Sequence, residues 1–237
     1  MINKLKQAIE ECKKIVFFTG AGMSTDSGIP DFRSATGLYT NNLHAEEIIS
    51  HHYFLEDTKS FYDFYKDKMV FVDAKPNYGH LFISELEKQG KDISVVTQNI
   101  DGLHQLAGSS KVYELHGSIH RNYCMKCHTF YPLSKIVNSN GIPLCDKCGG
   151  IVKPDVVLYE EGLDQETIES AINAIENAEL MIILGTSLNV YPAASFVRYF
   201  RGKYLAIINK SQTPADNECD IVIHDGISET FKKLNEN

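Results

Sequence analysis

The chain has 237 residues, of which 43% are hydrophobic and 23% are charged. These fractions exclude a fibrous or disordered protein, and at about 150 residues per domain the length predicts one or two domains. The formal net charge of −8 disfavours a dedicated nucleic-acid binder, which is normally basic. No apolar run approaches the ~20 residues of a membrane span, and the N-terminus lacks the apolar core of a secretory signal. We therefore expect a cytoplasmic protein with no membrane partner.

Short apolar strands alternate with helical patterns along most of the chain. The first helix is indicated by Ile2, Leu5, Ile9 and Cys12, which recur at helical spacing. In chain order we expect a helix at 2–12, a strand at 15–19, irregular helices at 44–72, a helix at 76–89, strands at 93–97 and 112–115, an extended run at 155–158, a helix at 166–177, a strand at 180–184, a helix at 193–200, strands at 204–208 and 221–223, and a helix at 228–234. Continuous apolar strands joined by helices are typical of a parallel sheet covered on both faces. Residues 119–153 interrupt this rhythm and are expected to form an inserted small domain.

Four of the six cysteines form two Cys-x-x-Cys pairs, at 124 and 127 and at 145 and 148. Two such pairs at this spacing can supply the four thiolates of a closed tetrahedral zinc site, which leaves no open position for catalysis. We therefore predict one structural Zn²⁺, bound by Cys124, Cys127, Cys145 and Cys148. The two other cysteines are expected to be small buried hydrophobic residues: Cys12 and Cys219.

A glycine-rich turn directly follows the first expected strand. Gly20, Ala21 and Gly22 stand where a dinucleotide-binding fold has its first turn, whose glycines let the backbone approach a pyrophosphate and whose following helix offers free N–H groups. The match to G-x-G-x-x-G is incomplete, because Thr25 occupies the third glycine position and no acidic residue ends an obvious second strand. This pattern disfavours an ordinary dehydrogenase and leaves both nucleotide binding and an ordinary turn open.

Polar residues follow three further strands, where a plain core would be apolar. They are TQNIDGLH at 97–104, ELHGS at 114–118 and GTSL at 185–188. Ligands bind beyond the carboxyl ends of strands in open α/β sheets, so we expect these segments to converge on one site. His116 is a candidate general base because histidine titrates near neutrality, with a purely structural role as the alternative.

Together these residues resemble the signatures of the sirtuins, the NAD-dependent protein deacylases. The resemblance is carried by residues 20–33 (GAGMSTDSGIPDFR) and 97–104, followed in the family's order by His116-Gly117, the two cysteine pairs and residues 185–188. It extends from about residue 10 to the C-terminus and looks like the compact bacterial type.

The resemblance implies an α/β fold in which a Rossmann-like parallel sheet domain binds NAD, beside a small domain made of a helical module and a zinc ribbon. The implied boundaries are 1–35, 76–118 and 154–237 for the large domain, and 36–75 and 119–153 for the small one. The implied activity is NAD-dependent protein lysine deacetylation, which consumes NAD and releases nicotinamide, O-acetyl-ADP-ribose and the free lysine. The acyl-lysine protein or peptide would lie in the cleft between the domains.

Motif positions in the family imply a role for individual residues. His116 would be the catalytic base, and Phe32 and Arg33 would belong to a cofactor-binding loop in which Phe32 shields the reacting ribose carbon. The implied contacts are Ala21, Gly22 and Thr25 with the pyrophosphate; Gln98 and His116 with the ribose; Asn99, Ile100 and Asp101 with nicotinamide; Thr186, Ser187 and Asn209 with phosphate and the adenosine ribose; Asp225 and Ile227 near the adenine; and Val156, Val157 and Tyr159 with the substrate.

One departure concerns the substrate strand, which in the family usually ends in Phe-Gly-Glu. Here the matching residues are Tyr159, Glu160 and Glu161, so a charged side chain stands at the glycine position. We expect Glu160 to affect the choice of peptide by narrowing its channel or adding charge beside it, and to leave the chemistry unchanged.

The acyl group is expected to be acetyl or another uncharged chain. Family members that prefer acidic acyl groups resemble one another in a Tyr-x-x-Arg pair before the run that is residues 76–80 here. Counting back without gaps, the matching positions are Phe64 and Asp67, and an aspartate would repel a carboxylate. Tyr65 and Lys68 would form such a pair only if a one-residue gap shifted the register.

Two other functions are open alternatives. Some sirtuins are assigned mono-ADP-ribosyltransferase activity, but the presence of His116 favours deacylation, including that of longer uncharged acyl groups. A non-catalytic zinc ribbon that binds nucleic acid would need clustered basic and aromatic residues, and segment 119–153 carries few basic residues: Arg121, Lys126, Lys135, Lys147 and Lys153. We therefore expect no nucleic-acid partner, and we expect the chain to act as a monomer.

Overall fold

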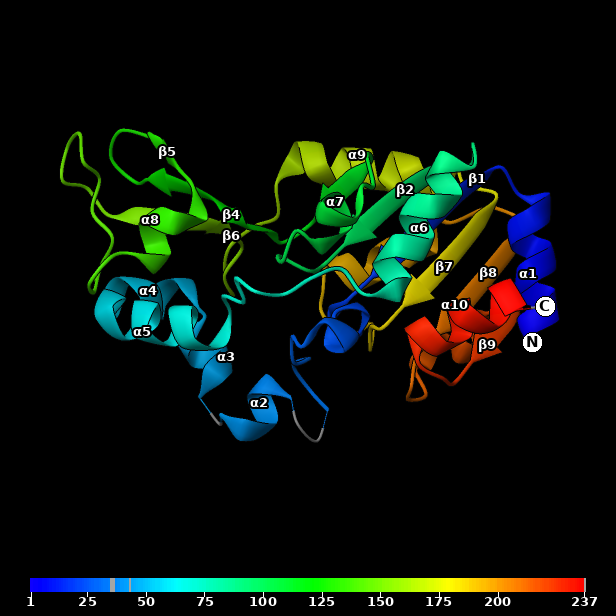
Figure 1. Cartoon of the computed structure of the whole chain (residues 1–237). Coiled ribbons are helices and arrows are strands. Elements are labelled where there is room, and N and C mark those ends of the chain that lie inside the picture. The colour runs from blue at the N-terminus through cyan, green and yellow to red at the C-terminus, as the bar shows by residue number, and fades with distance from the viewer. Residues whose placement is uncertain (35–36, 43, 237) are drawn as a thin grey trace.

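The larger layer of the molecule is a six-stranded parallel sheet (Figure 1). A computed structural model describes residues 1–34, 37–42 and 44–236. The strands are β1 (Lys14–Thr19), β2 (Asp92–Thr97), β3 (Val112–Glu114), β7 (Leu180–Leu184), β8 (Tyr204–Ile208) and β9 (Ile221–Ile223). Their order in the sheet is β3-β2-β1-β7-β8-β9, which is the strand order of a doubly wound dinucleotide-binding fold. The prediction of a Rossmann-like α/β fold is confirmed.

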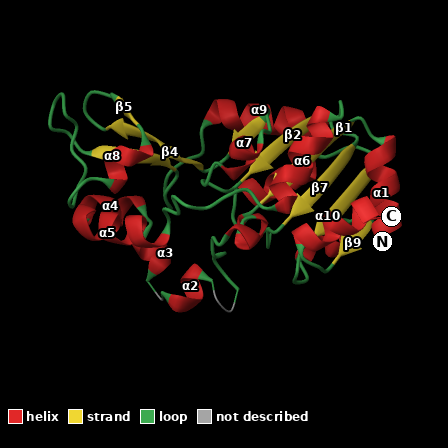
Figure 2. Cartoon of the chain, viewed as in Figure 1, coloured by secondary structure: helices red, strands yellow, loops and turns green. Residues whose placement is uncertain are grey.

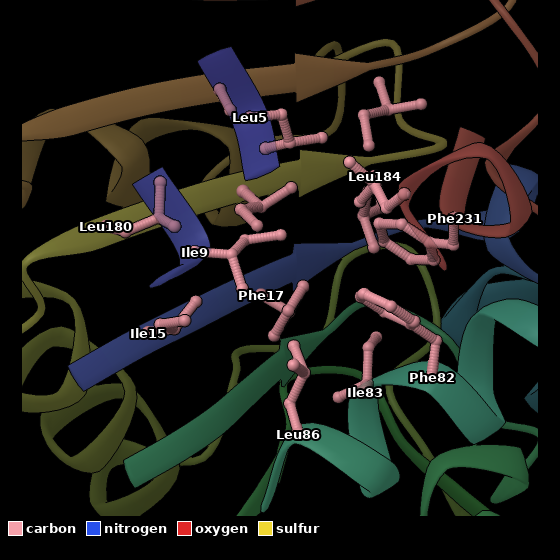
Figure 3. Close-up of a cluster of buried hydrophobic side chains, with 14 of the residues drawn as sticks. Leu5, Ile9, Ile15, Phe17, Phe82, Ile83, Leu86, Leu180, Leu184 and Phe231 are labelled. Carbon is pink, nitrogen blue, oxygen red and sulfur yellow. The ribbon is translucent and has the colours of Figure 1, made fainter. Parts of the chain in front are cut away.

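Both faces of this sheet are covered by helices. Alternate side chains of β1 therefore pack into two separate cores, one on each face of the sheet. Ile15 and Phe17 join a core with residues of α1 (Ile2–Glu11), α6 (Tyr78–Lys88) and α10 (Ile227–Glu236), and Figure 3 shows this cluster. Val16 and Phe18 pack on the opposite face against α9 (Gln165–Glu176) and the 3-10 helix η3 (Ala193–Tyr199). The continuous apolar runs are thus strands buried on both sides.

A smaller module lies beside the sheet, on the left in Figure 2. Its antiparallel sheet has the order β5-β4-β6, from β4 (Gly117–Cys124), β5 (Phe130–Tyr131) and β6 (Val152–Val156), with α8 (Leu133–Val137) packed on it. Helices α4 (His51–Glu56) and α5 (Thr58–Lys68) share a third core with this sheet, in which Phe61 and Tyr62 pack with Ile119 and Ile136. Two stretches that are far apart in the sequence therefore form one module.

Several predicted elements differ in detail. The segment expected as irregular helix is three helices, α3 (Ala45–Ile48), α4 and α5, because Ser50 and Asp57 each cap a new helix by accepting a backbone N–H. Residues 193–199 form a 3-10 helix, not an α-helix. The turn after Gly20 continues as two short 3-10 helices, η1 (Ala21–Met23) and η2 (Thr25–Ser27), and not as the long helix of an ordinary dinucleotide fold.

The expected extended run at 155–158 is part of a longer feature. Strand β6 begins at Val152 and pairs antiparallel with β4, which starts at Gly117, two residues before the segment expected to form the inserted small domain, and continues into it as far as Cys124. Within the described ranges, no helix is long and apolar enough to cross a membrane.

Candidate active site

The site begins where β1 and β7 end side by side, at the point where the strand order of the sheet reverses. The N–H of Gly22 donates to the carbonyl of Gly185 at 2.8 Å. A Cβ on Gly22 would lie 2.8 Å from the Cα of Gly185, and Gly185 has a φ of +58°, which favours glycine. Only glycines let the two turns approach this closely, and their backbones line the floor of a cavity.

This cavity has a volume of about 770 Å³ and is lined both by residues that follow the strands of the large sheet and by residues of the small module. All the predicted cofactor and substrate residues line it, although they come from turns after β1, β2, β3, β7, β8, β9 and β6. They are Ala21, Gly22, Thr25, Phe32, Arg33, Gln98, Asn99, Ile100, Asp101, His116, Val156, Val157, Tyr159, Thr186, Ser187, Asn209, Asp225 and Ile227. The strand ends therefore converge on one space.

Asn99 and Asp101 are held by hydrogen bonds to the glycine-rich turn. The Asn99 side-chain amide donates to the carbonyl of Gly20 at 3.0 Å and to Ser24 Oγ at 3.1 Å, and the Ser24 hydroxyl donates to Asp101 Oδ2 at 2.7 Å. The other oxygen, Oδ1, accepts the N–H of Leu103 at 2.9 Å. Burial raises the pKa of Asp101, against the effect of these two hydrogen bonds. Each carboxylate oxygen keeps free acceptor capacity toward the cavity.

His116 follows β3 and is oriented by the backbone of the neighbouring strand end. Its Nδ1 lies 3.0 Å from the carbonyl oxygen of Gln98. A carbonyl only accepts, so Nδ1 carries the proton and Nε2 of the neutral ring is an unprotonated acceptor. Burial lowers the pKa of His116 below its ordinary value, although the Gln98 carbonyl opposes this shift. The ring is therefore neutral at pH 7 and can accept a proton at Nε2.

The residues expected on the adenosine side already have partners within the protein. Gln98 Nε2 donates to Thr186 Oγ1 at 3.2 Å, and Asn209 Nδ2 donates to the carbonyl of Ser211 at 2.7 Å. The Asp225 carboxylate forms an ion pair with Lys233, which lowers the pKa of Asp225. These contacts hold the side chains at the cavity wall.

The residues after β6 form the opposite wall. The N–H of Val157 donates to the carbonyl of His116 at 3.0 Å, so this extended segment is tied directly to the expected base. Glu160 has a φ of +75°, a left-handed conformation that favours glycine. Its carboxylate accepts from the N–H and Nδ1 of His52 at 3.0 and 2.7 Å.

The gapless count along the sequence predicts that Phe64 and Asp67 lie at the acyl group. The residues that line the cavity do not agree with this prediction. Lys68 lines the cavity and neither of those two residues does. The Lys68 ammonium lies 2.9 Å from Asp67 Oδ2, so a carboxylate that binds Lys68 has to compete with Asp67. Tyr65 does not reach the cavity, because its side chain is fully buried in the core of the small module.

The four paired cysteines meet in the small module. Their sulfur atoms all lie within 4.8 Å of one another, with Sγ–Sγ distances of 3.4 Å between Cys124 and Cys148 and 3.5 Å between Cys127 and Cys145. Four thiolates at 2.3 Å from a tetrahedral Zn²⁺ would be about 3.8 Å apart, so the arrangement fits zinc. Of the other two, Cys12 is buried, as predicted, and Cys219 is half-buried.

Sequence reasoning missed several residues of the site. Ser24 joins Asn99 to Asp101 and is almost fully buried; its position within the glycine-rich motif was the available signal. Tyr39 and Met69 also line the cavity, but nothing local in the sequence distinguishes them from core residues. Their role depends on how the helical segment packs.

Comparison with known proteins decides the family. The sequence model described as "Sir2 family" matches residues 20–192. The chain belongs to the Sir2 family. The resemblance seen in the sequence motifs is thereby confirmed.

Relatives of this Sir2-family chain match it over almost its whole length. A protein of Clostridium acetobutylicum named "NAD-dependent protein deacetylase" is 56% identical, covering 98% of this chain and 97% of the relative. A protein of the same name from Clostridium perfringens is 55% identical, with 98% of both chains covered. The solved structure "Sir2-p53 peptide-NAD+" has a TM-score of 0.88 and 37% identity, covering 100% of this chain and 98% of that one.

Proposed function

We propose that this chain is an NAD-dependent protein lysine deacetylase, which consumes NAD and releases nicotinamide, O-acetyl-ADP-ribose and the free lysine. The observation that carries the proposal is the single cavity in which the strand ends at the switch point, His116 and the segment after β6 meet. Relatives at 55–56% identity bear the name of this activity, and a structure 37% identical is titled as a complex with peptide and NAD+.

The turns after β1 and β7 are the proposed cradle for NAD. Gly22 and Gly185 pack backbone against backbone, which brings both turns to the edge of the cavity, where the backbone of a glycine-rich turn can approach a pyrophosphate. Thr186, Ser187 and Asn209 hold the phosphate and adenosine ribose, with Asp225 and Ile227 near the adenine. Bound NAD supplies an activated glycosidic bond to nicotinamide and the ADP-ribose that accepts the acyl group.

Asn99, Ile100 and Asp101 are the proposed nicotinamide pocket. The Asp101 carboxylate keeps acceptor capacity after binding Ser24 and Leu103, so it can accept from a carboxamide N–H₂. The buried Asn99 amide, fixed by Gly20 and Ser24, holds this segment in place. The pocket is therefore preorganised by bonds within the protein.

His116 is the proposed general base. Its Nδ1–H is anchored on the Gln98 carbonyl, so the free Nε2 accepts a proton from a ribose hydroxyl. Burial keeps the ring neutral by lowering its pKa, and the base is ready at physiological pH. Phe32 and Arg33 also line the cavity, and Phe32 shields the reacting carbon from water.

The segment Val156–Tyr159 is the proposed seat of the acyl-lysine peptide. It is extended, lines the cavity and is tied to His116 by the Val157 N–H. Positioning of the acyl oxygen against the ribose matters here because a neutral amide oxygen is a weak nucleophile. Glu160 stands at the end of this segment and adds a carboxylate beside the peptide.

We propose further that the chain comprises two domains, with 1–35, 76–118 and 154–237 in the larger, and 36–75 and 119–153 in the smaller. The separate core shared by α4, α5 and the small sheet supports this division; residues 35, 36 and 43 lie outside the described ranges. Zinc at Cys124, Cys127, Cys145 and Cys148 stabilises the small domain, since four thiolates leave no open position.

We also propose a cytoplasmic monomer without nucleic-acid or membrane partners. Zinc-binding thiols suit a reducing compartment, and the net charge of −8 opposes binding to nucleic acid. Every residue that the resemblance assigns to the cofactor or the substrate belongs to this chain and lines the cavity, which is what a monomeric enzyme needs.

The test is to incubate the purified protein with an acetyl-lysine peptide, with and without NAD, and to identify every product by mass spectrometry. We expect free lysine, nicotinamide and O-acetyl-ADP-ribose in equal amounts, and no reaction without NAD. An ADP-ribosylated peptide with the acetyl group retained would instead support mono-ADP-ribosyltransfer. A faster reaction with butyryl-lysine would identify a deacylase for longer uncharged acyl groups.

A further inference from the structure

Two tyrosines join opposite walls of the cavity by a hydrogen bond. Tyr39 Oη and Tyr159 Oη lie 2.8 Å apart, although 120 positions separate them in the sequence. Tyr39 belongs to α2 (Leu38–Asn41), shortly after Phe32 and Arg33, and Tyr159 lies just beyond β6. Both rings line the cavity and are half-buried. Because both tyrosines are half-buried, water weakens this hydrogen bond less than it would at the protein surface.

Tyr39 is fixed to the segment that carries Phe32 and Arg33. Its N–H donates to the carbonyl of Phe32 at 2.9 Å. The rings of Phe32 and Tyr39 have centroids 5.2 Å apart, and the Arg33 guanidinium lies 5.2 Å from the centre of the Tyr39 ring. A displacement of Tyr39 therefore displaces the residues proposed to cover NAD.

Tyr159 is fixed in the same way to the segment proposed to hold the peptide. Its N–H donates to the carbonyl of Ile49 at 3.1 Å, and its own carbonyl accepts the N–H of His51 at 3.0 Å. Two residues earlier, Val157 donates to the carbonyl of His116. A movement of residues 156–159 therefore moves the Tyr159 hydroxyl and, through its hydrogen bond, the Tyr39 hydroxyl.

The link is a hydrogen bond between two phenol hydroxyls, either of which can be the donor. Burial is the main cause that raises the pKa of Tyr39, and its hydrogen bond with Tyr159 adds to the effect. The Tyr39 phenol is therefore neutral at physiological pH, and the link is a neutral hydrogen bond. Such a bond has a modest net strength, which is suited to a link that can open and close.

We propose that the Tyr39–Tyr159 hydrogen bond is a positioning device that couples NAD binding to peptide binding. The proposal rests on the proposed deacetylase function. Peptide seated on residues 156–159 holds Tyr159, which holds Tyr39 and so keeps Phe32 and Arg33 over NAD. Because binding coupling is reciprocal, NAD tightens peptide binding by the same factor.

The test is a double-mutant cycle with Tyr39→Phe, Tyr159→Phe and the double variant. Each change removes one hydroxyl and keeps the ring, and Tyr199→Phe, whose side chain is exposed outside the cavity, is the matched control. Calorimetry would measure the affinity for carba-NAD, a non-cleavable analogue, with and without saturating acetyl-lysine peptide. The ratio of the two dissociation constants is the coupling factor. Steady-state kinetics on NAD would give KM and kcat separately.

We expect each single variant to reduce the coupling factor by about two- to tenfold, and to raise KM for NAD at saturating peptide by a larger factor than it lowers kcat. The double variant should be no worse than either single one, because both remove the same bond. Coupling equal to wild type in all variants, effects that add in the double variant, or no coupling in the wild type would overturn the proposal. Absence of deacetylation by the wild type would instead refute the proposed function.

Discussion

As the pH falls, this protein should lose stability at a higher pH than the one at which its carboxylates titrate, because two histidines are buried in contact with each other. His80 in α6 and His104 in α7 (Leu103–Ala107) are 0% and 1% exposed, with ring centroids 4.7 Å apart. His80 Nδ1 accepts the N–H of Asn77 at 3.3 Å, and His80 Nε2 has no partner among the described residues. Burial lowers the pKa of His80 to about 4. Burial, followed by repulsion from His80, lowers the pKa of His104 well below its ordinary value.

The magnitude follows from proton linkage. An unfolded histidine has a pKa of about 6.5, so below pH 6.5 the unfolded chain binds protons that folded His80 and His104 do not bind until much lower pH. The stability present above pH 6.5 is therefore lost as the pH falls toward 4. At pH 5 this costs about 2 kcal/mol for His80, and His104 adds a loss in the same direction because its pKa is also lowered. The loss from His80 alone is a substantial part of the 5–15 kcal/mol typical of a folded domain.

Urea unfolding of the zinc-loaded protein between pH 7.5 and pH 5 would measure this effect. His80→Gln removes the titration but keeps an acceptor at a position where glutamine suits the helix cap. His44→Gln is the matched control, because the His44 side chain is 79% exposed. We expect His80→Gln to lose about 2 kcal/mol of the pH dependence and His44→Gln to follow the wild type. Zinc release at low pH affects all three proteins alike. A wild-type stability that is flat over this range, or an unchanged slope in His80→Gln, would refute the reasoning.

Four further predictions concern the proposed site. His116→Ala should reduce kcat by about 10²–10⁴-fold with carba-NAD binding retained. In the wild type, kcat/KM should fall only below pH 6.5, since burial lowers the pKa of the base; wild-type turnover in the variant would exclude His116 as the base. Cys145→Ser, or a strong chelator, should unfold the small module and abolish activity, because zinc binding is largely folding free energy. Elemental analysis should find one zinc per chain, and an active metal-free protein would contradict this. Asp101→Asn should weaken nicotinamide inhibition and NAD cleavage at an unchanged Tm, whereas a lost thermal transition would mean that Asp101 is structural. Finally, kcat/KM should be higher for an acetyl-lysine than for a succinyl-lysine peptide, because Asp67 competes with a succinyl carboxylate for Lys68 and repels it; a preference for succinyl would show that Lys68 binds the carboxylate in spite of Asp67.

Much of the fold and of the site could be predicted from short stretches of sequence. The apolar run of β1 and the glycines after it predict a buried strand and a tight turn, because both depend on residues within a few positions of one another. The two Cys-x-x-Cys pairs predict a metal site for the same reason. His116 stands in a recognisable motif directly after a strand, and strand ends in a parallel sheet converge whatever the rest of the chain does.

Other features were decided only by the tertiary structure. That residues 193–199 form a 3-10 helix and not an α-helix depends on packing, and local propensity does not distinguish the two. Whether Asp67 or Lys68 lines the cavity depends on the rotation of α5, which the core around Phe61 and Tyr65 sets. The sequence shows that position 160 is a glutamate, but only the structure shows that its backbone is left-handed.

The bond between Tyr39 and Tyr159 is the clearest such case. The sequence marks Tyr159 as a candidate substrate contact but does not distinguish Tyr39, and 120 positions separate the two. They meet because the segment after β6 pairs with the start of α4 while Tyr39 stays attached to Phe32. A local pattern determines a strand, a turn or a ligand pair, because its energy lies in nearby residues. Contacts across the cavity depend on the packing of two domains around it, and that packing is a property of the whole chain.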